Sequence, residues 1–191
     1  MGREFELKYA ATAAQLQVLK DRYPHLRPIA METTYYDNAA GDFSRLKWTF
    51  RRRMENEKSV CTLKTPADGL DRAEFEVECG GIEEAVPLLL AQGAPRELLL
   101  LTSGGVSHSC GAKFTRLAGI LELPGCTVEL ALDEGVLLGG GKELPFREVE
   151  VELKEGSKAA AVAFGQVLAA QLHLQTEPRS KVARARALAQ K

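Results

Sequence analysis

Hydrophobic and polar residues alternate with a period of two over residues 3–9, 71–79 and 146–154, which is the spacing of a β-strand that buries one face. Five further stretches favour strands: 30–37, 46–54, 58–65, 107–122 and 126–133. The sequence MENEK predicts a hairpin, and NAAG at 38–41, Asp68-Gly69, LPG at 123–125 and GGG at 139–141 predict turns.

Apolar residues recur at helical spacing in three other segments, residues 12–22, 81–92 and 157–173. Thr12 is a suitable N-cap for the first of them, and the charged tail from residue 180 also favours a helix. Antiparallel strands with few helices predict an α+β fold in which the sheet closes into a barrel or tunnel with peripheral helices. At 191 residues and without a linker, we expect one domain over residues 1–191.

The polar face of these strands is almost entirely charged and is sorted by sign. In the first strand Glu4, Glu6 and Lys8 share one face, and Phe5 and Leu7 share the other. Acids also gather on the late strands, whereas bases gather on the strands at 46–54 and 58–65. A sheet with one face in water explains any single strand, but a surface selected for solubility mixes both signs. We therefore predict an inside-out barrel, with charged faces toward a polar lumen and apolar faces under the helices.

The composition of the chain limits the classes of molecule that it is expected to bind and the compartment in which it is expected to lie. The chain is 45% hydrophobic and 27% charged with a formal net charge of −1, which argues against a generic nucleic-acid binder. No apolar run approaches the roughly 20 residues of a membrane span, and the charged start is unlike a signal peptide. The four cysteines lack CxxC spacing and the three histidines are scattered, so we expect reduced thiols, no zinc site and a cytoplasmic protein.

A lumen of this kind suits a charged guest. Clustered carboxylates bind hard cations such as Mg²⁺ or Mn²⁺, and clustered Arg and Lys bind phosphate oxygens. A polyphosphate carrying a metal ion satisfies both. The segment Gly139–Lys142 lacks the GxxxxGK[ST] spacing of a phosphate loop, and a hairpin turn explains it.

These residues carry a resemblance to a known family. The start EFELK at residues 4–8 is similar to the ExExK signature of the CYTH proteins, also called triphosphate tunnel metalloenzymes. The motifs that follow occur in the family's order and spacing: FRRR at 50–53, TLK at 62–64, RAEFEVE at 72–78, KFTR at 113–116, VELALDEG at 128–135, EVEVELK at 148–154 and RSK at 179–181. The stretch LLLLTSGGVSHSCG at 98–111 departs from the pattern.

The resemblance implies an eight-stranded antiparallel β-tunnel that binds a triphosphate with a divalent metal. The metal ligands it implies are Glu4, Glu6, Glu148 and Glu150, with Asp133 and Glu152 as further ligands. The phosphate-binding residues it implies are Lys8, Arg51, Arg53, Lys64, Arg116 and Lys181, and a further charged strand lines the lumen with Arg72, Glu74 and Glu76. The residues it places at the reaction itself are Glu4, Glu6, Lys8, Arg51, Arg53 and Lys64.

Our leading hypothesis is a metal-dependent hydrolase of inorganic triphosphate or a related small triphosphate, because the lumen offers little for a base or sugar. By parity Trp48 lies opposite Arg51 and Arg53, which predicts core packing. Adenylyl cyclase chemistry on ATP, thiamine triphosphatase activity and a non-catalytic polyphosphate or nucleotide sensor stay open, and so does a homodimer. A purely structural barrel is the remaining alternative.

Overall fold

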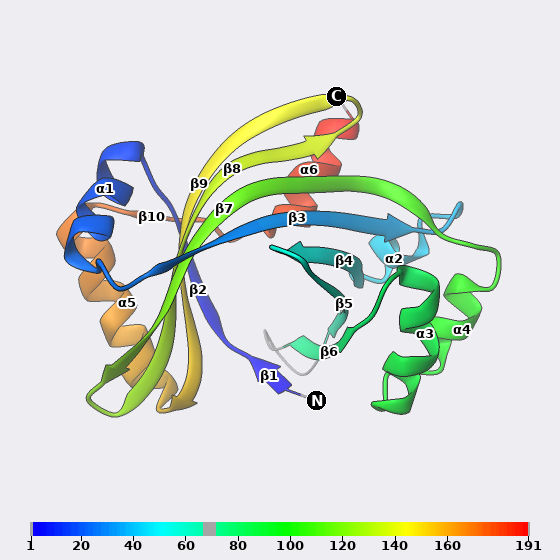
Figure 1. The fold of residues 1–191 in the computed structure, drawn as a ribbon, viewed down its shortest axis with the longest axis horizontal. Helices are drawn as coiled ribbons and strands as arrows, with labels where there is room; N and C mark the ends of the chain where they lie inside the picture. The colour runs from blue at the N-terminus through cyan, green and yellow to red at the C-terminus, as the bar shows by residue number, and fades with distance from the viewer. Residues whose placement is uncertain (1, 67–71, 191) are drawn as a thin grey trace.

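The computed structural model describes the backbone of residues 2–66 and 72–190 and the side chains of residues 5–66 and 73–190. Its strands form one antiparallel sheet in the order β1-β6-β5-β4-β3-β7-β8-β9-β2-β10 (Figure 1). The strands are β1 (Gly2–Glu4), β2 (Glu6–Ala10), β3 (Arg27–Asp37), β4 (Thr49–Glu55), β5 (Lys58–Pro66), β6 (Arg72–Glu78), β7 (Ser107–Leu123), β8 (Cys126–Gly139), β9 (Lys142–Gly156) and β10 (Gln175–Thr176).

The sheet has ten strands where the sequence predicts eight. The N-terminal strand is divided at Phe5 into β1 and β2, and the two-residue β10 is added beside β2. The two halves of the N-terminal segment lie on different neighbours, since β1 pairs with β6 and β2 pairs with β9. In the described residues the strand order runs from β1 at one edge of the sheet to β10 at the other. The predicted antiparallel sheet is confirmed, and its closure into a barrel stays a prediction.

Six helices accompany the sheet in the described chain: α1 (Ala13–Arg22), α2 (Asp42–Arg45), α3 (Ile82–Ala91), α4 (Glu97–Thr102), α5 (Lys158–Leu172) and α6 (Lys181–Ala189). Figure 1 shows α1 and α5 together at the left end of the curved sheet and α2, α3 and α4 at the right end, with α6 below β8 and passing behind β7 in this view. The helices predicted at 12–22, 81–92 and 157–173 and in the tail are confirmed, whereas α2 and α4 were not predicted.

The helix starts follow from local capping. At α1 the Thr12 side chain accepts a hydrogen bond from the backbone N–H of Gln15, whose side chain accepts one from the backbone N–H of Thr12. At α5 the Ser157 side chain accepts from the backbone N–H of Ala160. Each cap satisfies a donor that the first helical turn leaves open, which stabilises the helix by about 1 kcal/mol.

The outward faces of the strands are apolar and lie under helices, as the inside-out prediction requires. Leu130 and Val149 are fully buried in one core, which also contains Leu16 of α1 and Leu168 of α5. A second core joins β4, β5 and β6 to α2, α3 and α4, and its buried members include Phe43, Phe50, Leu63, Leu89 and Leu98. Each fully buried side chain of this size stabilises the fold by about 1.5–3 kcal/mol, so the outer cores hold the sheet together.

Several smaller predictions are confirmed. Trp48 packs in the second core against Phe43, with ring centroids 6.4 Å apart. The four cysteines are buried free thiols. Within the part of the chain that the structure describes, no helix combines the length and the apolarity that a membrane crossing needs.

Helix α6 differs from the other long helices because it packs on the inner side of the sheet. Val182 and Ala185 share a cluster of buried residues with Met31, Phe114 and Phe146, whose strands are β3, β7 and β9. This helix therefore fills one end of the concave side and brings its own charges to the lumen.

Candidate functional site

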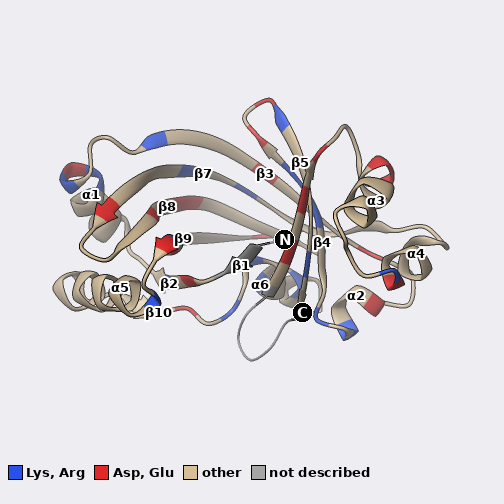
Figure 2. Cartoon of the chain, turned by 90° about the horizontal axis from the view of Figure 1, so that it is seen from below, with Lys and Arg blue, Asp and Glu red and all other residues tan. Residues whose placement is uncertain are grey.

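The concave side of the sheet encloses a cavity of about 960 Å³ with a strongly charged lining. Its position follows from strand parity, because inward residues alternate with the apolar residues that the helices cover. The charged side chains that line it are Lys8, Arg51, Arg53, Lys64, Arg116, Lys154, Lys158 and Lys181, which are basic, and Glu6, Glu55, Glu74, Glu76, Glu129, Glu150 and Glu152, which are acidic. Figure 2 shows these strands with Lys and Arg in blue and Asp and Glu in red.

One wall of the cavity is basic and is formed by β4 and β5. Arg51 and Arg53 project from alternate positions of β4, and Lys64 projects from β5. Glu74 of β6 pairs with two of them, at 3.8 Å from Arg51 and 3.3 Å from Lys64. Burial and the neighbouring Arg51 lower the pKa of Arg53 from its ordinary value, so this wall favours the approach of an anion.

Arg53 is the member of this wall with the clearest unused donor. Its guanidinium pairs with Glu55, yet its buried Nε finds no hydrogen-bond partner among the described residues. A buried donor without a partner is unfavourable by about 1–3 kcal/mol, and a phosphate oxygen can accept from it.

The opposite wall is acidic and crosses three neighbouring strands. Glu6 of β2 lies directly opposite Glu152 of β9, which in turn lies opposite Glu129 of β8. Lys154 approaches two of these carboxylates, at 2.8 Å from Glu152 and 3.9 Å from Glu129, and Lys8 lies 3.6 Å from Glu6. Like charges at directly opposed positions repel, so a cation bound beside this row of carboxylates would lower their electrostatic repulsion.

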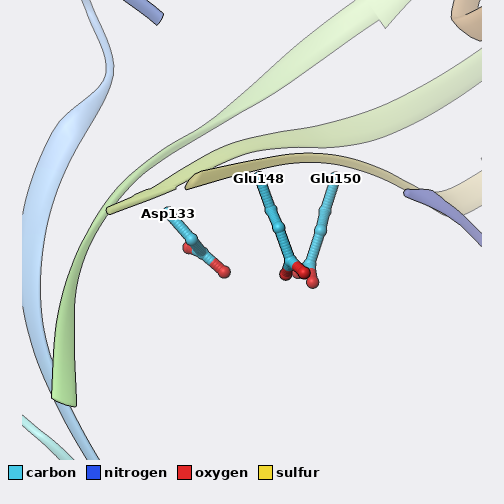
Figure 3. A group of neighbouring side chains, drawn as sticks. All are labelled: Asp133, Glu148 and Glu150. Atoms are coloured by element: carbon cyan, nitrogen blue, oxygen red, sulfur yellow. The ribbon is translucent and has the colours of Figure 1, made fainter. Parts of the chain in front are cut away.

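A second group of acids lies deeper, beside the first. Asp133 and Glu148 are opposed residues of β8 and β9, and Glu150 follows on the same face of β9. Ligand oxygens of the three carboxylates lie within 4.8 Å of one another, and all three residues are buried. Figure 3 shows their carboxylates directed toward one another from the two strands.

Three cations of the protein neutralise this group. The Lys181 ammonium lies 2.8 Å from Asp133, 2.6 Å from Glu148 and 2.7 Å from Glu150. Arg116 donates two hydrogen bonds of 2.8 Å to Asp133 and also pairs with Glu150, and Arg184 pairs with Glu148. The three buried negative charges are therefore matched by three positive ones.

The ion pairs of this group shift the pKa values of Lys181 and Glu150. Burial disfavours the charged form of Lys181, but its attraction to Glu150, Asp133 and Glu148 outweighs burial and raises the pKa of its ammonium. Burial also opposes the charge of Glu150, yet Lys181 and Arg116 hold the pKa of that carboxyl well below its usual range. Both groups are charged near neutral pH.

The donor set fits a hard divalent cation. Carboxylate oxygens are the ligands that Mg²⁺ and Mn²⁺ prefer, and Asp133, Glu148 and Glu150 supply them at mutual distances within 4.8 Å. The position among them already attracts a cation, since the Lys181 ammonium lies there. Glu150, Glu152 and Glu6 also line the cavity, so the two acidic groups are continuous.

The structure gathers most of the sequence-predicted site residues around this cavity. Eleven of them line it: Glu6, Lys8, Arg51, Arg53, Lys64, Glu74, Glu76, Arg116, Glu150, Glu152 and Lys181. Asp133 and Glu148 lie behind the lining and are fully buried. The side chains of Glu4 and Arg72 lie outside the described residues, so their predicted roles stay predictions.

Two predicted phosphate-binding residues pair with the buried carboxylate group of Asp133, Glu148 and Glu150. Arg116 and Lys181 contact Asp133 and Glu150. The physical reason is that an unpaired buried carboxylate is costly, and these cations are the nearest charges that compensate it.

Four charged residues of the lining were not among the predicted site residues: Glu55, Glu129, Lys154 and Lys158. Glu55 shares the inward parity of Arg51 and Arg53 on β4. Glu129 shares the inward parity of Asp133, and Lys154 that of Glu150 and Glu152, so the alternation of these strands carried a signal for both. Lys158 begins α5 and lies over the ring of Phe5, 4.3 Å from its centroid. No pattern in the sequence placed a helix start at the cavity.

A curated protein is similar to this chain in sequence. The chain is 28% identical over 139 residues to the inorganic triphosphatase of Haemophilus influenzae, an alignment that covers 71% of this chain and 39% of that protein. The chain thus spans about two fifths of the length of this curated relative.

Solved structures share the fold. A "putative adenylate cyclase" of Bacillus halodurans superposes with a TM-score of 0.74 at 19% identity, covering 96% of this chain and 98% of that one. A "putative adenylyl cyclase" of Hippeastrum, described as having a dominant triphosphatase activity, superposes with a TM-score of 0.70 at 19% identity, covering 97% and 96%. The model of the CYTH domain matches residues 2–185, and the chain therefore belongs to the CYTH domain family.

Proposed function

We propose that this protein hydrolyses inorganic triphosphate, or a related small triphosphate, with the help of a divalent metal ion. The observation that carries the proposal is a single cavity with Arg51, Arg53 and Lys64 on one wall and the row Glu6, Glu152 and Glu129 on another. An anion with a bound cation is the one class of small ligand that satisfies both walls.

The charges of the lining explain why anion and cation belong together. Eight basic and seven acidic side chains of the described residues nearly cancel. A triphosphate alone adds several negative charges to a partly buried site, which favours the simultaneous binding of a divalent cation. In this proposal residues 1–191 form one tunnel domain, which the N-terminal segment closes by reaching both β6 and β9.

Each group of residues has a chemical role in the proposal. Arg51, Arg53 and Lys64, together with Lys8, hold the phosphate oxygens and stabilise the charge that develops on the transferred group. Glu6, Glu150 and Glu152, with Glu4, Asp133 and Glu148, hold Mg²⁺ or Mn²⁺. When bound, such an ion supplies Lewis-acid polarisation of phosphate oxygens and of a water molecule. The carboxylates of the lining would orient an attacking water toward the terminal phosphorus, and no protein nucleophile is required.

Four further charged residues hold the side chains of the two walls in place. They are Arg116, Lys181, Glu74 and Glu76. Glu74 fixes Arg51 and Lys64 by ion pairs, and Glu76 accepts a hydrogen bond of 3.2 Å from Thr62. In the proposal Asp133, Glu148 and Glu150 would be compensated by a bound metal ion, and Arg116 and Lys181 would then be available to phosphate oxygens.

An organic triphosphate is the second candidate, because part of the lining is apolar. Ile29 and Ala118, from the paired strands β3 and β7, line the cavity beside Arg116. A volume of about 960 Å³ also lies within the range of sites for much larger ligands, roughly 300–1,000 Å³. ATP, with either hydrolysis or cyclisation, and thiamine triphosphate therefore belong in the test.

The test is phosphate release from a panel of inorganic triphosphate, ATP and thiamine triphosphate, with Mg²⁺, with Mn²⁺ and with EDTA. The proposal expects metal-dependent release of orthophosphate from at least one of them. Formation of cyclic AMP and pyrophosphate from ATP would identify a cyclase instead. Tight binding of all three without turnover would identify a non-catalytic sensor and refute the hydrolase.

A further inference from the structure

Tyr35 is an inward residue of β3 to which the proposed function assigns no role. It lies directly opposite Arg51 of β4, lines the cavity and is only 3% exposed. Its ring belongs to the buried cluster that contains Val182 and Ala185 of α6. The side chain is thus fixed between the basic wall and the helix that fills one end of the concave side.

The hydroxyl of Tyr35 has no hydrogen-bond partner in the described part of the chain. No residue of the described chain makes a hydrogen bond to it, although the backbone carbonyl of Tyr35 accepts one of 3.0 Å from Ser109. Buried tyrosine hydroxyls normally have a hydrogen-bond partner, because an unpaired one loses its hydration without compensation. Tyr35 is almost fully buried as a residue and lines the cavity, and its hydroxyl has no hydrogen-bond partner among the described residues, so this donor is available to a ligand in the cavity.

The surroundings of this hydroxyl select the kind of ligand. Burial raises the pKa of the Tyr35 phenol, and the nearby charges of Arg51, Lys181 and Arg53 only partly offset that rise. The group therefore remains a neutral O–H donor near neutral pH and adds no negative charge beside an anion. The three cations around it attract an acceptor that is negatively charged.

We infer that the Tyr35 hydroxyl donates a hydrogen bond to a non-bridging oxygen of the terminal phosphate of the bound triphosphate. The inference rests on the proposed function and extends it by a substrate-binding residue and a direction for the substrate. Because α6 closes the space on its side of Tyr35, a phosphate at this position has no room for a substituent. The terminal phosphate lies toward α6, and any organic group lies away from α6, toward Lys158 at the start of α5, which also lines the cavity.

The neighbouring Tyr36 provides a matched control. It points to the opposite face, lies in the outer core and has its ring centroid 6.3 Å from that of Phe50. Tyr35→Phe and Tyr36→Phe each remove one hydroxyl and keep the ring. A hydrogen bond to a charged phosphate predicts that Tyr35→Phe lowers kcat/KM by about 10- to 100-fold, while Tyr36→Phe leaves it within about twofold of the wild type.

The experiment measures kcat and KM with every triphosphate that the wild type hydrolyses. It also measures the rise in melting temperature that inorganic triphosphate produces in EDTA, where metal-dependent turnover does not consume it. Each variant is compared with its own ligand-free value, so a variant that is merely less stable still reports its binding. The inference expects a smaller rise for Tyr35→Phe and an equal loss of kcat/KM for inorganic and organic triphosphates.

Three results overturn the inference. Tyr35→Phe can match the wild type in both measurements. It can lower the ligand-free melting temperature and leave the triphosphate-induced rise unchanged, which indicates a purely structural role. It can also lose activity only with organic triphosphates, which places the hydroxyl at the wrong end. A wild type that releases no phosphate refutes the proposed hydrolase, and the EDTA measurement still decides whether Tyr35 binds the phosphate chain.

Discussion

Lys181→Met removes the cation at the centre of the buried carboxylates and keeps a side chain of similar length. The wild-type group balances Asp133, Glu148 and Glu150 with Lys181, Arg116 and Arg184. The variant leaves one buried negative charge without compensation. Breaking a buried pair in this way destabilises a protein by about 3–5 kcal/mol, so the free energy of unfolding in EDTA falls by that amount.

A divalent cation reverses much of this loss. In the variant no ammonium competes for the position among the three carboxylates, and Mn²⁺ can bind there. At a metal concentration about 100 times the dissociation constant, binding stabilises the folded state by about 2.7 kcal/mol. In the wild type the metal must first displace the Lys181 ammonium, so the increment from the same Mn²⁺ concentration is smaller.

The assay is urea unfolding of both proteins in EDTA and across a series of Mn²⁺ concentrations. Lys113→Met is the matched control, because Lys113 pairs with Glu32 at 3.0 Å while both side chains are more than half exposed. An exposed pair contributes about 0–1 kcal/mol, so this control changes little and responds to Mn²⁺ like the wild type. Equal stability of Lys181→Met and wild type in EDTA, or equal Mn²⁺ increments, would refute the reasoning.

Three further substitutions test two residues of the site and one ion pair outside it. Arg53→Met lowers kcat/KM by at least about 100-fold, as expected for a lost phosphate contact, with little change in melting temperature, because burial and Arg51 already disfavour its charge. Glu6→Gln raises the Mg²⁺ or Mn²⁺ concentration that half-maximal activity requires, and an unchanged metal titration contradicts its role. Hydrogen bonding to Arg179 lowers the pKa of the Glu177 carboxyl to about 2. The ionised carboxylate therefore stabilises the folded state at pH 7, by about 1 kcal/mol once the exposure of Arg179 is taken into account. Unfolding of Glu177→Gln and wild type should therefore differ at pH 7 and converge as the pH falls from about 4 to 2.

The face of each strand side chain was predictable because a strand alternates strictly. Arg51, Arg53 and Lys64 were placed in the lumen and Trp48 in the core by parity alone, and the structure agrees. Parity does not give the order of strands in a sheet. The opposition of Glu6, Glu152 and Glu129 depends on β2, β9 and β8 being neighbours, which only long-range pairing decides.

The positions of the short helices could not be predicted for a related reason. Helix α2 spans four residues, too few for a periodic pattern, and its first turn is held by Asp37, whose carboxylate accepts hydrogen bonds from the backbone N–H groups of Phe43 and Ser44. Helix α4 lies in the apolar stretch that departs from the family pattern. The tail was expected to be helical and the family resemblance assigned Lys181 to the lumen. No residue pattern of the tail indicated that α6 packs inside the sheet, because the carboxylate partners of Lys181 and Arg184 are far away in the sequence.

The fold separates the source of its stability from the source of its chemistry. The two outer cores bury large apolar side chains under α1 and α5 and under α2, α3 and α4, whereas the lumen holds charges that repel within each wall. Substitutions on either wall therefore remove a ligand contact and relieve repulsion at the same time, so activity can fall while the fold persists. Lys181 and Arg116 are the exceptions, because they compensate buried carboxylates of the sheet. A substitution there acts on stability and function together, and added metal ions can distinguish the two effects.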